Sequence, residues 1–457
     1  MLVPDQAGGE APADLPAVLG DNLGLGMLGS NRGGSGQHWI VTQGPRDGAV
    51  VRLGELGRLA NWNGRFQNAR MFPRSIVTAL HAAAARFPIV VVLGARQVGK
   101  TTLARAAFKA HRYLDLEDPR TAERFRQDAR FELDAGAGAG AGLILDEAQA
   151  VPSVFGALRG AVDAQRARLG RFIVLGSAQP ASVRGVSESL AGRAAVIELD
   201  PLTAHEAEQG PEPVPWSQVW LKGGFPDALR GDSRAWWESY LRLVLERDLP
   251  QYGVRADPLF MRRLLTMLAH QHGGLLNASA LGGSLGVSHH TLLRHIDVLE
   301  SIYLLRRLPP YFRNVGKRLT KAPKTYLRDT GLLHHLLNIA TADELASHPS
   351  RGASWEGFVI EDLLRRERLV HPSTQAFFWR TAVGAEIDLV LDRGSERIAV
   401  EIKAGRGDDA RAVRVLREAM PDVAAARGWI VDQAAGVERV GEGIARAGFA
   451  AVVQGTP

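Results

Sequence analysis

The segment "FPIVVVLGARQVGKTTLARAAFKA", residues 87–110, decides the fold of this sequence. Its apolar run predicts a buried strand, and the residues after the run match the phosphate-loop pattern G-x-x-x-x-G-K-[ST] from Gly94 to Thr101. In such a loop, backbone N–H groups and the amino terminus of the next helix surround nucleotide phosphates. The alternative is a Gly-rich turn that ends in a surface lysine. The strand before the motif and the helical run after it favour the phosphate loop.

The motif predicts how the loop would bind ATP with Mg²⁺. Lys100 would reach the β- and γ-phosphates, and the Thr101 hydroxyl would ligate Mg²⁺. We expect the nucleotide to contact Gly94, Ala95, Arg96, Gln97, Val98, Gly99, Lys100, Thr101 and Thr102.

A second apolar run, "LILDEAQ", supplies an acidic pair of the kind that completes a phosphate-loop site. Asp146 would hold Mg²⁺ through its bound water, and Glu147 would orient or deprotonate the attacking water. The alternative is a helix that starts with acidic residues, because Asp and Glu favour helix amino termini.

Two further segments offer residues that could respond to the γ-phosphate. The strand "FIVLGSAQ" ends in Ser177 and Gln179, which are candidate γ-phosphate sensors. The segment "ESLAGR" ends in Arg193, a candidate arginine finger. A surface arginine is common, so an ordinary exposed side chain remains the alternative for Arg193.

Composition limits the class of protein. A chain of 457 residues is long enough for about three units, and 46% hydrophobic with 23% charged residues is typical of a soluble globular protein. No apolar run is long enough for a membrane span, and the amino terminus lacks the pattern of a secretion signal, so we expect a cytoplasmic protein. The absence of cysteine excludes thiolate zinc sites, and the thirteen histidines form no HExxH or similar ligand spacing, so any metal should have oxygen ligands. A net charge of +6 is compatible with a polyanionic partner.

The composition and the hydrophobic pattern of the sequence change along the chain and predict four segments. Residues 1–70 are rich in glycine, lack lysine and show no sustained period, so we expect a poorly ordered extension that adds nothing to the ATP site. Residues 71–200 alternate strand and helix signals, the pattern of a parallel sheet with crossover helices. Residues 201–350 are mainly helical, and residues 351–457 carry an amphipathic helix followed by strands.

The middle segment contains a winged-helix pattern. "NASALGGSLGVSHHTLLRHIDVLESIYLLRRLPPY" predicts a helix, a turn, a second helix with Arg294 and His295, and a short strand. The following "RNVGKRLTKAPK" is a basic segment that could meet DNA phosphates through Arg313, Lys317, Arg318, Lys321 and Lys324. A solvated charge run, or a winged helix that contacts protein, is the alternative.

With these residues in place, the chain from Met71 onward resembles a bacterial and archaeal family of AAA+-type ATP-binding proteins. The resemblance rests on "PRSIVTAL", "GARQVGKTTL", "LILDEAQ", "VLGSAQ", "SLAGR", "GGFPDAL", "ERDL", "LPPYFRNVGKRLTKAPKTYLRDTGLL" and "FFWRTAVGAEIDLVL…AVEIK". It implies an α/β multidomain protein with a three-layer α/β/α P-loop ATPase core, a winged-helix middle region and a restriction-endonuclease-like α/β terminal domain. It implies no settled biological role.

The hairpin "EIDLVLDRGSERIAVEIKAG", residues 386–405, carries charges where β-formers prevail. In a nuclease-like fold, Asp388 and Glu401 could converge on one Mg²⁺ ion while Lys403 stabilises the phosphorane charge. An acidic residue from the preceding helix usually completes such a site. Glu356 fits this role, with Glu361 as the weaker choice. An inactive nuclease-like binding domain and plain surface charges are the two alternatives.

The sequence therefore predicts an ATP-hydrolysing P-loop protein that couples its nucleotide state to a DNA-binding or nuclease module. The alternative is a nucleotide-dependent switch that recognises a protein partner and has a catalytically inactive nuclease-like scaffold. An oligomer is compatible with both.

Overall fold

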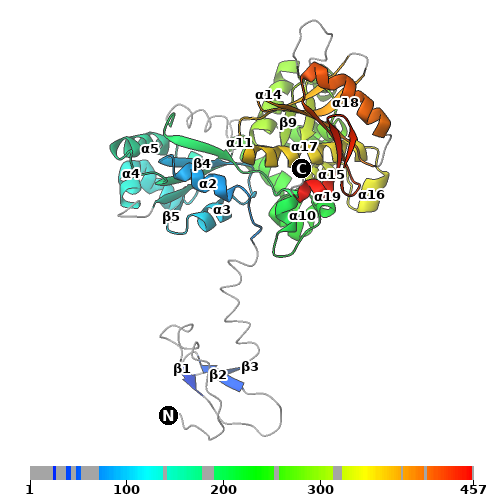
Figure 1. The fold of residues 1–457 in the computed structure, drawn as a ribbon. Helices are drawn as coiled ribbons and strands as arrows, with labels where there is room; N and C mark the ends of the chain where they lie inside the picture. Colours follow the sequence, from blue (N-terminus) through cyan, green and yellow to red (C-terminus); the bar gives the residue numbers. More distant parts are fainter. Residues whose placement is uncertain are drawn as a thin grey trace. The chain divides into compact units, whose positions relative to one another are not determined.

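The computed structural model describes residues 24–26, 38–42, 48–52, 71–136, 142–177, 190–251, 257–311, 322–381, 384–405 and 409–454. The chain divides into two compact units, Met1–Met71 and Phe72–Pro457 (Figure 1). None of the helices that the structure describes combines the length and the apolar composition needed to span a membrane.

The first unit contains a small antiparallel sheet in the order β1-β2-β3. Its strands are β1 Gly24–Gly26, β2 His38–Thr42 and β3 Gly48–Arg52. These strands differ from the expectation of a segment without regular structure. β2 and β3 are only five residues each, too short to give a sustained period, although "IVT" and "VV" are good strand formers. The other residues of this segment lie outside the described part of the chain.

The second unit forms a compact body without the first 71 residues, which leads to a test by truncation. We expect a chain that starts at Met71 to be soluble, with the melting temperature and ATP turnover of the full chain, because the whole phosphate loop lies beyond the deletion. Thermal melting and ATP turnover, measured beside the full chain, check this. Loss of the cooperative transition would show that the extension is a structural part of the ATPase unit.

The amino-terminal part of the second unit is a five-stranded parallel sheet in the order β5-β6-β7-β4-β8. Its elements alternate along the chain as the sequence predicts: α2 Val77–Ala84, β4 Ile89–Leu93, α3 Lys100–Ala107, β5 Arg112–Asp115, α4 Pro119–Gly136, β6 Leu143–Asp146, the 3₁₀ turn η1 Ala148–Ala150, α5 Ser153–Ala164, β7 Phe172–Gly176 and β8 Ala194–Glu198. Because the strands are parallel, the phosphate loop and the acidic pair leave the sheet at the same edge.

Helices cover both faces of this sheet. Strand β4 is buried along its whole length, and its side chains alternate between two cores. Val90 and Val92 join the core that holds Leu80 of α2 and Leu103 of α3, whereas Ile89, Val91 and Leu93 join the core of α4 and α5. The three layers can be followed in Figure 1.

The middle of the chain is helical, as predicted. It comprises α7 Ala204–Glu208, α8 Trp216–Lys222, α9 Pro226–Arg230, α10 Ser233–Leu243, the π-helical turn η2 Val244–Asp248, α11 Leu249–Gln251, α12 Pro258–His270, α13 Ala278–Leu285, α14 His289–Ser301, β9 Leu305–Leu308, β10 Lys324–Leu327, α15 Thr330–Leu336 and α16 Ala342–Ser347. Strands β9 and β10 pair antiparallel after α13 and α14. The predicted order of helix, turn, helix and strand is therefore present.

The last part is a six-stranded mixed sheet in the order β11-β12-β13-β14-β16-β15. Its elements are α17 Arg351–Val370, β11 Gln375–Arg380, β12 Glu386–Asp392, β13 Arg397–Ile402, α18 Asp409–Val423, β14 Arg427–Asp432, β15 Val437–Gly441, β16 Ile444–Gly448 and α19 Phe449–Val453. Strands β12 and β13 form the predicted antiparallel hairpin, with Asp392 opposite Arg397. Side chains of α18 pack with Ile387 and Ala399, whereas those of α17 share a core with Leu389 and Val400, so the two helices cover opposite faces.

One hydrophobic core runs from the parallel sheet through the helical region into the terminal domain. Trp355 of α17 packs edge-on against Trp216 and Trp220 of α8, with ring centroids 5.5 and 5.0 Å apart. The predicted segments 71–200, 201–350 and 351–457 are thus joined by shared packing.

Two histidines in this core are held in the neutral form. Burial lowers the pKa of His334 to about 4, and its Nδ1 and Nε2 lie 2.9 and 2.7 Å from the Leu221 carbonyl oxygen and Ser354 Oγ. Burial, with a smaller contribution from His334, lowers the pKa of His272 to about 3, and its Nδ1 accepts from the Leu327 N–H group. Both pKa values lie below the ordinary value of 6.5. Below pH 6.5 the unfolded chain therefore binds more protons than the folded chain, and acid favours unfolding.

These histidines should make the fold sensitive to acid. Between pH 7.5 and pH 5, each should lower the free energy of unfolding by about 2 kcal/mol, because 1.4 kcal/mol is lost per pH unit below 6.5. Urea unfolding of His334→Asn at both pH values should show a pH-dependent loss smaller by about that amount. The exposed His270→Asn variant is the control, and an unchanged pH dependence in His334→Asn would contradict the assignment.

Candidate functional site

The phosphate loop follows β4 and ends where α3 begins, and two glycines permit its path. A Cβ atom on Gly94 would lie 2.3 Å from the carbonyl oxygen of Leu199, so only glycine fits beside the residue that follows β8. Gly99 has φ +98° and caps α3, a left-handed conformation that favours glycine. Both glycines of the motif are therefore required by the backbone.

Lys100 lies inside this loop. Its side chain is 6% exposed, and its ammonium donates to the carbonyl oxygens of Gly94 and Ala95 at 3.0 and 2.9 Å. Burial lowers the pKa of Lys100, while the nearby carboxylates of Glu147 and Asp146 act in the opposite direction. The cation is thus held at the amino end of α3, where a phosphate would meet both the ammonium and the backbone N–H groups.

Asp146 and Thr101, the two residues that the sequence predicts around Mg²⁺, meet at the end of β6. The Thr101 hydroxyl donates to Asp146 Oδ2 at 2.5 Å, and the Tyr113 hydroxyl of β5 donates to the same oxygen at 3.0 Å. Burial raises the pKa of Asp146, and these two hydrogen bonds oppose the rise. The donor set is a carboxylate with a hydroxyl, which are oxygen ligands that Mg²⁺ accepts.

Glu147 follows directly in a left-handed conformation, with φ +49°. This conformation is unusual for a residue other than glycine and is frequent at functional sites. The carboxylate accepts from Ser177 Oγ at 2.8 Å and from the Gln149 side chain. Burial alone would raise the pKa of Glu147, but Lys100, Ser177, Arg96 and Gln149 together lower it. Glu147 is therefore an oriented, ionised carboxylate beside the phosphate loop.

The remaining predicted contacts differ in position. Ala95 and Val98 are buried, Arg96 and Gly99 are half-buried, and Gln97 and Thr102 are exposed. Ser177 reaches the site at the end of β7, but through Glu147. Gln179, the second candidate sensor, lies outside the described residues.

Arg193 is not brought to this site. It directly precedes β8, its carbonyl accepts from the N–H group of Ile89, and its guanidinium binds both oxygens of Asp163 at 2.8 and 2.9 Å. Ile89 is the first residue of β4, so Arg193 lies at the opposite edge of the sheet, roughly 16 Å of strand from the phosphate loop. Arg193 is therefore distant from the phosphate loop of its own chain, and its role as an arginine finger stays a prediction.

Sequence reasoning missed a contact between the phosphate loop and the helical region. Arg96 donates to Glu117 Oε1 at 2.6 Å, and its Nε lies 3.1 Å from Asp248 Oδ2. Asp248 ends the π-helical turn η2, is 1% exposed, and has its pKa raised to about 6 by burial despite the opposing effect of Arg96. Single π-helical turns are frequent at functional sites.

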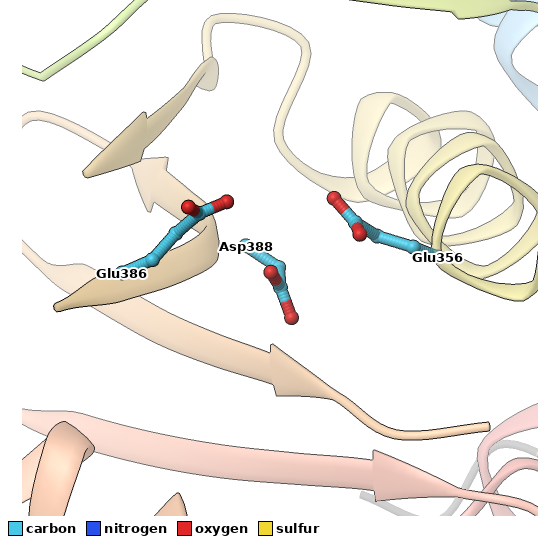
Figure 2. A group of neighbouring side chains, drawn as sticks. All are labelled: Glu356, Glu386 and Asp388. Atoms are coloured by element: carbon cyan, nitrogen blue, oxygen red, sulfur yellow. The ribbon is translucent and has the colours of Figure 1, made fainter. Parts of the chain in front are cut away.

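A second site lies in the terminal domain, where oxygens of Glu356, Glu386 and Asp388 lie within 4.8 Å of one another. Figure 2 shows Glu356 on α17 facing Glu386 and Asp388 on β12. Between the pairs Phe377↔Val390 and Trp379↔Ile387, β11 advances by two residues and β12 by three, so a β-bulge lies next to Asp388. The sequence predicted Glu356 and Asp388 for a metal site and missed Glu386.

Lys324 fills the space between these carboxylates. Its ammonium lies 2.8 Å from Glu356 Oε1 and 3.8 Å from Asp388 Oδ1, and it forms an ion pair with Glu386. Tyr326 on the same strand donates its hydroxyl to Glu356. Burial opposes the charge on Lys324, but the three carboxylates raise its pKa above the ordinary value.

The predicted pair Glu401 and Lys403 lies beside this group. Lys403 forms an ion pair with Glu401 Oε1, whereas the other oxygen, Oε2, is buried and has no hydrogen-bond partner among the described residues. Burial raises the pKa of Asp388 well above its usual range, and Glu356 and Glu401 contribute to the rise. Glu401 is therefore electrostatically linked to the cluster, but it lies outside the 4.8 Å group.

Two other predicted residues have different roles in the structure. Glu361, the weaker choice for the metal, forms ion pairs with Arg306 and Arg328 instead. Lys324 is 3% exposed, so it cannot serve as an exposed wing lysine that meets DNA phosphates, as the sequence suggested. The other four residues of that basic segment, Arg313, Lys317, Arg318 and Lys321, lie outside the described part of the chain.

Comparison with known proteins gives an independent account of the same three parts. Residues 86–208 match the AAA domain, and residues 215–343 and 351–449 match two domains of unknown function, DUF8612 and DUF4143. Two uncharacterised proteins, of Mycobacterium tuberculosis (strain H37Rv) and Mycobacterium bovis, are each 40% identical over 364 residues. The alignment covers 78% of this chain and 79% of each relative. The chain belongs to the same family as these mycobacterial proteins.

This chain carries an AAA domain before two domains of unknown function, and the AAA domain implies the use of ATP with Mg²⁺ in residues 86–208. Among solved structures, a Walker-type ATPase of Pyrococcus abyssi is 15% identical, with a TM-score of 0.40. The match covers 58% of this chain and 96% of that chain. A STAND ATPase of Pyrococcus horikoshii with a tetratricopeptide-repeat sensor is also 15% identical, with a TM-score of 0.26. That match covers 66% of this chain and 50% of the other.

Proposed function

We propose that this AAA-family protein hydrolyses ATP at the phosphate loop and couples its nucleotide state to a terminal module that binds or cleaves DNA. The observation that carries the proposal is the meeting of Thr101, Asp146 and Glu147 beside Lys100 at one edge of the parallel sheet. This is the set of groups that phosphoryl transfer to water requires.

Each group has a role that follows from its position. Lys100 and the loop N–H groups bind the phosphates, and Thr101 with Asp146 would hold Mg²⁺, which neutralises phosphate charge when bound. Glu147 orients a water and accepts its proton, and Ser177 keeps the Glu147 carboxylate in place. The lowered pKa of Glu147 keeps it in the basic form at neutral pH.

Two sets of ion pairs support coupling between the parts. Arg96 of the phosphate loop forms an ion pair with Asp248 of η2. A movement of the loop on nucleotide binding would therefore move or break a contact with the helical region. Arg328, the residue after β10, binds Glu198 and Asp200 at the end of β8 at 2.6 and 2.5 Å. Because β8 pairs with β4, strand β10 is joined to the ATPase sheet at one end and to the carboxylate cluster through Lys324 at the other.

The nuclease part of the proposal rests on the donor chemistry of the terminal domain. Glu356, Asp388 and Glu401 offer oxygen ligands for Mg²⁺, and the unpartnered Glu401 Oε2 is a buried acceptor of the kind that a metal satisfies. A bound Mg²⁺ would activate water and stabilise phosphate charge, and Lys403 would add a cation beside the reacting phosphate. The mixed sheet flanked by α17 and α18 is compatible with a restriction-endonuclease-like fold.

The DNA-binding part rests on the helices and hairpin of the middle region. The order α13, α14, β9, β10 is that of a winged helix, in which α14 would be the recognition helix. Arg294 is exposed on α14 and can reach a phosphate or base edge, whereas His295 packs against Phe260 with ring centroids 5.0 Å apart.

A second candidate function is a nucleotide-dependent switch that binds a protein partner through an inactive nuclease-like scaffold. The position of Lys324 favours it, because an ammonium already occupies the space between the carboxylates. Assays of the purified chain with ATP and with plasmid, single-stranded and branched DNA, with and without Mg²⁺, distinguish the two functions. ATP turnover together with Mg²⁺-dependent cleavage supports the first, and ATP turnover without DNA binding or cleavage supports the second.

A further inference from the structure

The carboxylate cluster is enclosed by two different parts of the chain. Glu356, Glu386 and Asp388 come from α17 and β12 of the terminal domain, whereas Lys324 comes from β10 of the helical region. Lys324 is 3% exposed, and its ammonium forms ion pairs with all three carboxylates, with Asp388 Oδ1 the most distant at 3.8 Å. A cation of the chain therefore occupies the centre of an oxygen-lined site.

A second observation also points to a cation at this place. Glu401 is 6% exposed, and its Oε2 has no hydrogen-bond partner among the described residues, although Lys403 binds its Oε1. A buried carboxylate oxygen without a partner is costly. Glu401 Oε2 is thus a carboxylate oxygen beside the cluster that neither Lys324 nor Lys403 binds, and it is free to ligate a metal ion.

Neighbouring groups fix the Lys324 side chain. It lies over the Phe378 ring, with its Nζ 5.6 Å from the ring centroid, and Tyr326 orients the Glu356 carboxylate that accepts from it. Strand β10 pairs with β9 and not with β12, so the lysine does not belong to the sheet that carries the acidic residues. A shift of β10 relative to the terminal sheet would therefore move the ammonium without moving Glu386 or Asp388.

We propose that Lys324 is a tethered cation that occupies the divalent-metal position of this cluster, so that Mg²⁺ or Mn²⁺ binds only when the ammonium withdraws. The proposal rests on the metal-binding module of the proposed function and adds its regulation. A unit charge and a divalent ion that share the same oxygens repel each other strongly in a buried site. The lysine therefore keeps metal affinity low while β10 is in place.

Mn²⁺ binding to the full chain without nucleotide tests the proposal, with isothermal titration and the melting temperature as readouts. We expect Lys324→Met to bind Mn²⁺ at least about tenfold more tightly than the wild type, because removal of a neighbouring positive charge is worth more than 1.4 kcal/mol. In EDTA the variant should melt below the wild type, since three carboxylates lose their cation, and Mn²⁺ should restore its stability. Lys324→Arg keeps a cation in place and should resemble the wild type. Asp388→Asn removes one carboxylate of the cluster. The Mn²⁺ binding that this variant loses is the binding that occurs at the cluster.

Equal or weaker Mn²⁺ binding by Lys324→Met would overturn the proposal. If that variant does not fold, the pair Glu386→Gln and Lys324→Met/Glu386→Gln replaces it, because the double variant loses one charge of each sign. Tighter Mn²⁺ binding by the double variant than by Glu386→Gln supports the proposal. Equal binding by these two variants overturns it. ATP turnover, measured on all samples, separates the regulation of the metal site from the proposed ATPase activity. Turnover that persists leaves the ATPase proposal intact whatever the Mn²⁺ result. A wild type without turnover contradicts the ATPase proposal itself.

Discussion

Replacing Glu147 by glutamine should leave a chain that binds ATP but hydrolyses it about 10²–10⁴-fold more slowly, the usual contribution of a positioned general base. The amide of glutamine fills the same space and can still interact with Ser177 and Gln149, but it cannot accept a proton from water. The phosphate contacts of Lys100 and the loop are untouched. ATP affinity and turnover, measured on the same preparation, check both halves of this expectation.

The contrasting variant is Lys100→Ala, which should lose nucleotide binding itself because it removes the buried cation of the phosphate loop. Lys109→Ala, an exposed lysine just after α3, and Glu123→Gln, an exposed glutamate on α4, are matched controls and should behave as the wild type. Wild-type turnover in both Lys100→Ala and Glu147→Gln would remove the ATP assignment.

The second large effect concerns the terminal domain. Asp388→Asn should abolish Mg²⁺-dependent DNA cleavage while ATP turnover stays close to that of the wild type, because the two sites use different residues. Asp388 is 8% exposed, lies within the carboxylate cluster and accepts from the Ile402 N–H group at 2.8 Å. Asparagine keeps an acceptor for that bond and removes the charge.

Asp392→Asn is the control for this variant. Asp392 ends the same strand but forms an ion pair with Arg397, outside the cluster. It should retain cleavage. A wild type that shows neither metal binding nor cleavage on any DNA would instead favour the inactive scaffold and the protein-binding switch.

The sequence was sufficient for those features that are local along the chain. The phosphate loop, the alternation of strands and helices from Ile89 to Glu198, and the hairpin of β12 and β13 are each encoded within a few neighbouring residues, and the structure has all three. The acidic pair at the end of β6 follows from the same logic, because parallel strands bring their carboxyl ends to one edge.

The features that were missed depend on contacts between distant parts of the chain. Lys324 looked like one more basic residue of an exposed wing, yet it is buried among carboxylates 32 and more residues away in sequence. Two features of the sequence could have indicated that Lys324 is buried. It is a lysine in an arginine-rich chain, and it directly precedes the β-formers "TYL". The Arg96–Asp248 pair and the β-bulge next to Asp388 have no local signature. The position of Arg193 at the amino-terminal end of β8 has no local signature either, because an arginine after a Gly turn does not reveal which end of the sheet it reaches.

Hydrogen exchange of the Glu147→Gln chain, with and without Mg²⁺·ATP, tests coupling between the nucleotide site and the terminal cluster most directly. ATP should alter protection in the phosphate loop and also in η2, which holds Asp248, and in β10, which holds Lys324. The variant provides a long-lived ATP state for the measurement. Changes that extend to Val244–Asp248 and Lys324–Leu327 are the predicted result. Changes confined to the ATPase sheet and its loops, with η2 and β10 unaffected, would contradict the account.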